Sequence, residues 1–110
     1  MKLQPEPFQK IRCKEKTIEL RLLDEKRQLI IPGDEIEFTN LGNEDEKLTV
    51  RVGFLHKFSS FSELYKALPL DKCGYNSSSI KEASPSDMDA YYSAAEQSRY
   101  GVVGIEFELL

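Results

Sequence analysis

Lys16-Thr17-Ile18-Glu19-Leu20-Arg21 alternates polar and apolar residues and predicts a strand that continues to about Leu23. Successive side chains of a strand point to opposite faces, so the apolar residues at positions 18, 20 and 22 share the side that anchors in a core. Thr17, Glu19 and Arg21 share the other side, and Lys16 at the start of the strand can lean in beside them. We therefore take Lys16, Thr17, Glu19 and Arg21 as candidate ligand-binding residues, in a pocket for a polar or anionic ligand.

Three further strands are predicted downstream from the same alternation. A turn at residues 32–34 precedes the first of them, residues 35–39. Residues 42–46 are polar and predict a solvated loop. Residues 48–54 show the clearest alternation in the chain and predict a central hairpin partner, and residues 103–109 predict a half-buried strand near the end.

Helical signals lie between these strands. A short helix is expected at residues 7–11, and a second at 61–68, where Ser60 and Glu63 match a capping box. A third helix is expected from Pro85 to Gly101, with one face formed by Met88, Tyr91, Tyr92 and Ala95.

Short strands with interspersed short helices predict an α+β domain, a small closed or nearly closed β-barrel of about five to six strands flanked by helices. At 110 residues the chain is expected to form a single domain, residues 1–110. The order of elements lacks the regular strand–helix alternation of a doubly wound parallel sheet.

Composition narrows the function classes. There is no apolar run long enough to cross a bilayer and no secretory signal after Met1, so a cytoplasmic protein with no membrane partner is expected. Cys13 and Cys73 are too few and too far apart for a zinc site, and free thiols are expected, their role left open together with that of the single histidine, His56. We predict no metal and no cofactor.

The charge is unevenly distributed along the chain. The net charge is -4, which argues against a protein that coats nucleic acid nonspecifically. Residues 10–27 nevertheless hold seven Lys and Arg against four Asp and Glu, whereas residues 58–110 hold four against eight. A basic segment on an acidic body suits one local anionic site, although solvated charge without a partner is an equally good interpretation.

Standard catalytic motifs are missing. The chain has no glycine-rich phosphate loop, no HExxH and no nucleophile elbow, and one histidine gives little support for a triad. Glu19 and Arg21 also have a simpler interpretation, an exposed ion pair on the sheet worth ~0–1 kcal/mol.

Residues 14–21, Lys-Glu-Lys-Thr-Ile-Glu-Leu-Arg, resemble the G-x-K-x-x-E-x-R signature of the ASCH domain family in the PUA-like superfamily. The turn and strand at 32–38, the helix at 61–68 and the strand at 100–105 are also similar to that family, whose small bacterial single-domain members the chain resembles. Lys14 stands where the family usually has glycine, so this turn is either less tight or uses a left-handed lysine.

The resemblance implies a PUA-like barrel with a cleft lined by Lys16, Glu19 and Arg21 and a role with RNA or nucleotides. Some bacterial members are similar amidohydrolases that act on N4-acetylcytidine through a lysine, a threonine and a glutamate. The threonine of those enzymes corresponds to Glu19 here, and Thr17 on the same strand face is a weak substitute.

Three hypotheses follow. The first is a module that binds RNA, a nucleoside or a nucleotide, with Tyr75, Tyr91, Tyr92 or Tyr100 either stacking on bases or filling the core. The second is an amidohydrolase on an N4-acylated cytidine, with Lys16 and Glu19 as catalytic residues. The third is a protein-binding adaptor. The oligomeric state and the identity of the ligand stay open.

Overall fold

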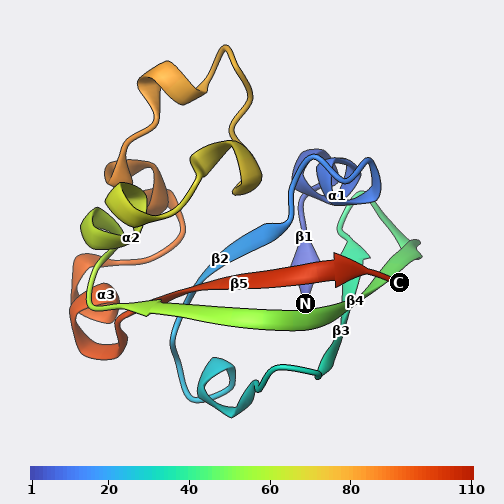
Figure 1. The fold of residues 1–110 in the computed structure, drawn as a ribbon, viewed down its shortest axis with the longest axis horizontal. Helices are drawn as coiled ribbons and strands as arrows, with labels where there is room; N and C mark the ends of the chain where they lie inside the picture. Colours follow the sequence, from blue (N-terminus) through green and yellow to red (C-terminus); the bar gives the residue numbers. More distant parts are fainter.

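The computed structural model describes residues 1–110 and contains one five-stranded sheet in the order β1-β3-β4-β5-β2 (Figure 1). All neighbouring strands are antiparallel except β1 and β3, which run parallel. The sheet curls into a half-barrel whose two edge strands are β1 and β2, so the expected α+β fold, a small curled sheet of five strands flanked by short helices, is confirmed. The strands are β1 (Lys2–Leu3), β2 (Ile18–Leu22), β3 (Glu35–Asn40), β4 (Asn43–Phe58) and β5 (Val102–Leu109).

Short helices surround the sheet. In Figure 1, α1 lies near one end of the long β4–β5 pair, and α2 and α3 lie near the other end. None of the helices is both long and apolar enough to cross a bilayer. The α-helices are α1 (Pro5–Arg12), α2 (Phe61–Ala67) and α3 (Ala94–Tyr100), and the 3-10 helices are η1 (Arg27–Leu29), η2 (Leu70–Lys72), η3 (Ile80–Glu82) and η4 (Pro85–Ala90).

Two apolar clusters pack on the sheet. The larger one is covered by α1 and includes Phe8, Phe38 and Ile105, each fully buried. The second lies between β2, α2 and η4 and includes Leu20 and Leu64. Because β5 contributes to both clusters, its first half is buried on both faces, whereas alternation predicted one solvated face.

The predicted loop at residues 42–46 is wrong, because β4 already begins at Asn43. A tight connection joins β3 to β4, and the side-chain Oδ1 of Asn40 accepts a hydrogen bond from the Gly42 N–H at 2.9 Å. Backbone pairing across this turn extends the strand through polar residues whose side chains stay in solvent. Apolar alternation gives no sign of such an extension.

The third predicted helix is two helices. η4 begins at Pro85, as expected, with Ser84 as its N-cap, but a second capping box formed by Ser93 and Glu96 starts α3. Tyr91 and Tyr92 fall in the break between them and so do not continue one helical face. Gly101 ends α3 with φ +72°, where an added Cβ would lie 2.9 Å from the carbonyl oxygen of Phe58.

Helix caps explain two other local features. Ser60 accepts a hydrogen bond from the Glu63 N–H, as expected for α2, but the Glu63 carboxylate accepts from Ser59 and does not complete the box with Ser60. Lys14, after α1, has φ +65°, so the left-handed lysine is confirmed. This conformation costs a non-glycine residue about 1–2 kcal/mol. The strained turn directs the chain from α1 into Lys16 and β2.

Candidate functional site

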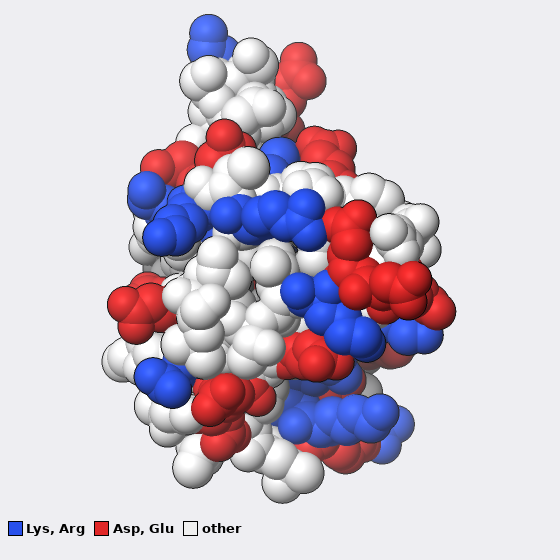
Figure 2. Space-filling model, turned by 90° about the vertical axis from the view of Figure 1, so that its right-hand side faces the viewer, with Lys and Arg blue, Asp and Glu red and all other residues white.

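Surface charge on the face that carries α1 is mixed. Figure 2 views the molecule from the side on which α1 and the C-terminus lie in Figure 1, and it shows basic and acidic side chains interspersed, without a broad area of one sign. This face therefore offers no long basic groove for a nucleic-acid backbone. Any anionic site there must be local.

The main pocket has a volume of about 510 Å³ and lies where the two edge strands, α1 and the segment after α2 approach one another. Pockets for small ligands commonly measure about 300–1,000 Å³. Lys16, Glu19 and Arg21 all line it, so three of the four residues expected to bind ligand are brought together. The other polar and aromatic lining residues include Lys2, Glu6, Lys10, Tyr65, Tyr75, Asp87, Tyr91 and Tyr92.

Glu19 joins the two basic residues in one buried cluster. Its Oε1 lies 2.6 Å from Lys16 Nζ, and its Oε2 lies 2.9 Å from Arg21 Nε. Lys16 and Glu19 are only 8% and 4% exposed. These contacts are therefore not the exposed surface pair of the simpler interpretation, and the cluster of Lys16, Glu19 and Arg21 is called the buried triad below.

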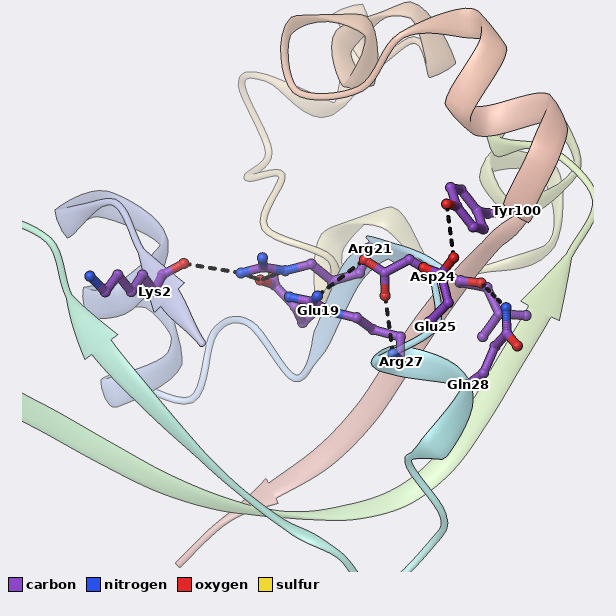
Figure 3. Close-up of polar contacts among 9 residues, drawn as sticks. Lys2, Glu19, Arg21, Asp24, Glu25, Arg27, Gln28 and Tyr100 are labelled. Atoms are coloured by element: carbon purple, nitrogen blue, oxygen red, sulfur yellow. Dashed lines mark hydrogen bonds and ion pairs between the residues drawn. The ribbon is translucent and has the colours of Figure 1, made fainter.

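Arg21 also connects the edges of the half-barrel. Its Nη2 donates to the carbonyl oxygen of Lys2 at 3.1 Å, and Figure 3 shows the side chain extending from β2 toward β1. The two edge strands share no backbone hydrogen bonds. The guanidinium therefore links them at the pocket.

The electrostatics of the triad favour an anion. Burial alone would raise the pKa of Glu19, but the charges of Lys16 and Arg21 and their hydrogen bonds outweigh it and hold the pKa below its usual range. Two cations and one carboxylate leave one net positive charge. Because that charge is largely removed from water, it interacts strongly with an anionic or carbonyl group entering the pocket.

The backbone of Gly74 lies near Lys16 and is held by Lys10. Lys10 Nζ donates to the Gly74 carbonyl oxygen at 2.6 Å. Gly74 has φ +114°, and an added Cβ would lie 3.5 Å from Lys16 Cδ. The glycine thus lets the loop after α2 turn while it lies close to the lysine.

Tyrosines form much of the remaining wall. Tyr75, Tyr91 and Tyr92, three of the four predicted stacking residues, line the pocket. Tyr100 does not, because its hydroxyl donates to Glu25 at 3.0 Å, away from the triad (Figure 3). Tyr65, on α2, also lines the pocket.

Several residues that line the pocket carry no sequence signal for a site. Lys10 lies in the basic segment but on a predicted helix, and Asp87 has only a capping signature. Lys2 belongs to a two-residue strand with no recognisable pattern. These residues reach the pocket through contacts between distant segments, which no local spacing encodes.

Thr17 is not among the residues that line the pocket. Its backbone N–H donates to the Lys72 carbonyl oxygen, and its own carbonyl oxygen accepts from the Phe107 N–H. Thr17 therefore connects the start of β2 to neighbouring segments through its backbone.

The two thiols and the histidine occupy different environments. Cys73 lines the pocket, and burial raises its pKa to about 12. Cys13 is exposed. His56 Nε2 lies 3.1 Å from Glu106 Oε1 and does not line the pocket. No group of three or more His, Cys, Asp or Glu residues is arranged to hold a metal ion.

Comparison with known proteins identifies one family, and the similar solved structures include the following two. The family model of the ASCH domain matches residues 1–110. A crystal structure of the hypothetical protein PH0355 has 34% sequence identity and a TM-score of 0.80, with 100% of this chain and 96% of that chain covered. A solution structure of protein PF0455 from Pyrococcus furiosus has 35% identity and a TM-score of 0.72, covering 100% and 94%. No curated protein matches the chain.

Proposed function

The chain belongs to the ASCH domain family, and from this premise we propose that residues 1–110 act as one domain that binds RNA or a nucleotide in the pocket between β1 and β2. The observation that carries the proposal is the buried triad, which presents one net positive charge to a pocket of about 510 Å³. A phosphate or a base carbonyl of the ligand would meet this charge.

Both cations keep hydrogen-bonding capacity for a ligand. Lys16 has three N–H donors, and Glu19 is the acceptor that the protein supplies. Arg21 uses Nε and Nη2 within the protein, which leaves the two hydrogens on Nη1. The planar guanidinium suits phosphate and base-edge acceptors, and Glu19 holds it in place.

Two tyrosines offer a stacking surface for a base. Tyr92 packs parallel to Phe61, with ring centroids 6.2 Å apart, so its ring is supported from behind. Tyr91 is 69% exposed at the pocket. Stacking of a base on an aromatic side chain contributes about 1–3 kcal/mol, and an exposed ring next to a cationic pocket is typical of single-strand recognition.

The charge distribution favours a small ligand or an unpaired base over a duplex. The net charge is -4, and the face that carries α1 has mixed charge and lacks the extended basic surface that duplex binding requires (Figure 2). The proposed ligand is therefore one nucleotide, either free or flipped out of an RNA strand.

Titration with nucleoside monophosphates and a short single-stranded RNA tests the proposal. We expect Arg21→Ala to weaken binding at least about tenfold, since a hydrogen bond to a charged group contributes about 1.5–3 kcal/mol. Arg51→Ala is the matched control, because Arg51 is an exposed cation on β4 outside the pocket. Equal affinity of the parent and Arg21→Ala, both folded by circular dichroism, would remove the proposal.

One contact favours amide hydrolysis of an N4-acylated cytidine as a second candidate. Lys16 Nζ and Glu19 Oε1 lie 2.6 Å apart at the pocket, within the distance that proton transfer requires. No serine or threonine lines the pocket, and the Cys73 thiol, with its pKa raised to about 12, stays protonated at neutral pH. The attacking nucleophile would then be water, whose proton Lys16 could take only after passing its own ammonium proton to Glu19.

Incubation with N4-acetylcytidine, followed by chromatography of the released cytidine, distinguishes the candidates. Turnover by the parent that Lys16→Ala abolishes would support hydrolysis. Binding without turnover above that of Lys16→Ala would leave the binding function alone.

A further inference from the structure

One wall of the pocket is a chain of three hydrogen-bonded side chains. The hydroxyl oxygens of Tyr65 and Tyr75 lie 2.7 Å apart, and the Tyr75 oxygen lies 2.7 Å from Asp87 Oδ2. Each of the three residues lines the pocket that also contains the buried triad. We call Tyr65, Tyr75 and Asp87 the acceptor wall, because these side chains offer a ligand only hydrogen-bond acceptors.

The carboxylate fixes the direction of every hydrogen bond in this wall. An ionised carboxylate only accepts, so Tyr75 must donate its single proton to Asp87. Tyr65 must then donate to the Tyr75 oxygen, because Tyr75 has no proton left. The reverse direction would replace a charge-assisted hydrogen bond with a neutral one and is disfavoured.

As a result, both hydroxyl protons are used within the wall, and only oxygen lone pairs remain for a ligand. The geometry is also held firmly. Asp87 Oδ2 accepts from the Ser84 N–H at 3.2 Å, and the Tyr65 ring packs edge-on against both Phe61 and Tyr75. Burial raises the pKa of Tyr65 and of Tyr75, so both remain hydroxyls far above neutral pH.

The triad has the opposite character. Lys16 and Arg21 can only donate, and Glu19 is occupied on both oxygens by these two residues. Lys16 and Tyr75 line the same pocket, and a Cβ added to Gly74, next to Tyr75 in the chain, would lie 3.5 Å from Lys16 Cδ, so the donor side and the acceptor wall face one cavity. A ligand that satisfies both must present acceptors to the triad and a donor to the wall.

We propose that the acceptor wall makes the pocket selective for nucleobases that carry an exocyclic amino group. This inference rests on the proposed function and names the class of base within it. A ribose hydroxyl can reverse between donor and acceptor and is not selected, whereas an amino group conjugated to a base ring acts as a donor only. A base with no such group would leave the wall's lone pairs unpaired, and these polar atoms are costly to desolvate.

Two ligand pairs that differ only by the amino group test the proposal. Adenosine is compared with purine riboside, and cytidine with 2-pyrimidinone riboside, each titrated into the parent protein by calorimetry. We expect the amino-bearing member of at least one pair to bind about threefold to tenfold more tightly, as for one neutral hydrogen bond.

Asp87→Asn tests the origin of this preference. An asparagine side chain can donate to Tyr75, which releases the hydroxyl protons of the wall to rotate toward the ligand. We expect the preference for the amino group to fall to within about twofold. Asp89→Asn is the matched control, because Asp89 carries the same charge on the same helix, η4, contacts Gln97 and lies outside the pocket lining.

Asp87→Ala is a second variant, in case Asp87→Asn does not fold. It removes the carboxylate and frees the Tyr75 proton to turn toward the ligand, so the preference is again expected to fall. Equal binding of both members of each pair by the parent, or an unchanged preference in folded Asp87→Asn or Asp87→Ala, overturns the acceptor wall while leaving the binding function in place. Failure of all four nucleosides, the monophosphates and RNA to bind the parent overturns both.

Discussion

Replacement of Glu19 by glutamine examines the buried triad most directly. The change keeps the size of the side chain but removes the negative charge between Lys16 and Arg21, whose side chains are 9% and 17% exposed. Breaking a buried ion pair by removing one partner typically destabilises a protein by about 3–5 kcal/mol. At about 4 °C per kcal/mol for a chain of this size, the melting temperature should fall by about 12–20 °C.

The pH dependence supplies a second signature of the same residue. Because the pKa of Glu19 is lower in the folded protein than its ordinary value of 4.5, ionised Glu19 stabilises the fold above that pH. This contribution is lost as the pH falls from about 4.5 through the folded-state pKa. Glu19→Gln has no such contribution to lose, so the stability difference from the parent should be largest near pH 7 and should shrink in acid.

Urea unfolding followed by circular dichroism at pH 7 and at pH 3 measures both effects. Glu37→Gln is the matched control, since Glu37 pairs with Lys47 at 3.4 Å on the sheet surface and both side chains are about half exposed. Such a pair contributes ~0–1 kcal/mol. If Glu19→Gln is as mild as Glu37→Gln, or if its effect does not diminish in acid, the triad does not have the buried, charge-balanced character described above.

Three other predictions concern the backbone and the thiols. Lys14→Gly should stabilise the fold by about 0.5–1 kcal/mol in urea unfolding, because glycine relieves the strain of the positive φ at Lys14. The greater freedom of glycine in the unfolded chain offsets part of this gain. A loss of stability would contradict the left-handed turn. Gly101→Ala should destabilise the fold by more than about 1 kcal/mol, because the alanine Cβ would lie 2.9 Å from the Phe58 carbonyl oxygen and the backbone has φ +72°. An unchanged melting temperature would show that the chain relaxes at this position. Iodoacetamide at pH 8 should label one thiol per folded chain, Cys13, because Cys73 is buried and its pKa is raised to about 12. If mass spectrometry finds Cys73 labelled as fast as Cys13, Cys73 is not buried.

Local patterns predicted most elements because each depends on near neighbours in the chain. The alternation at residues 48–54 and 103–109 follows from one apolar face per strand, and Ser60 and Ser84 begin helices because their side chains accept nearby backbone N–H groups. The errors also have local causes. The tight turn after Asn40 and the second cap at Ser93 are decided by hydrogen bonds that hydrophobic periodicity does not register.

The candidate site shows a similar division. Spacing alone placed Glu19 and Arg21 on one strand face, with Lys16 beside them at the start of the strand, but nothing local distinguished a buried cluster from a solvated pair. In the structure the cluster is buried where residues of β1, α1, β2 and the loop after α2 meet around the pocket, and Thr17 lies outside the pocket lining. The structure also adds Lys10, Tyr65 and Asp87, which come from three separate segments.

The order of polar and apolar residues thus determined by itself which segments become strands, where helices begin, and that a lysine, a glutamate and an arginine emerge together at β2. Tertiary structure alone decided that these charges lose contact with water and border a pocket with tyrosines about 50–70 positions further along the chain. The physical reason is that side-chain direction depends on a residue's neighbours in sequence, whereas desolvation depends on whatever distant chain packs above it.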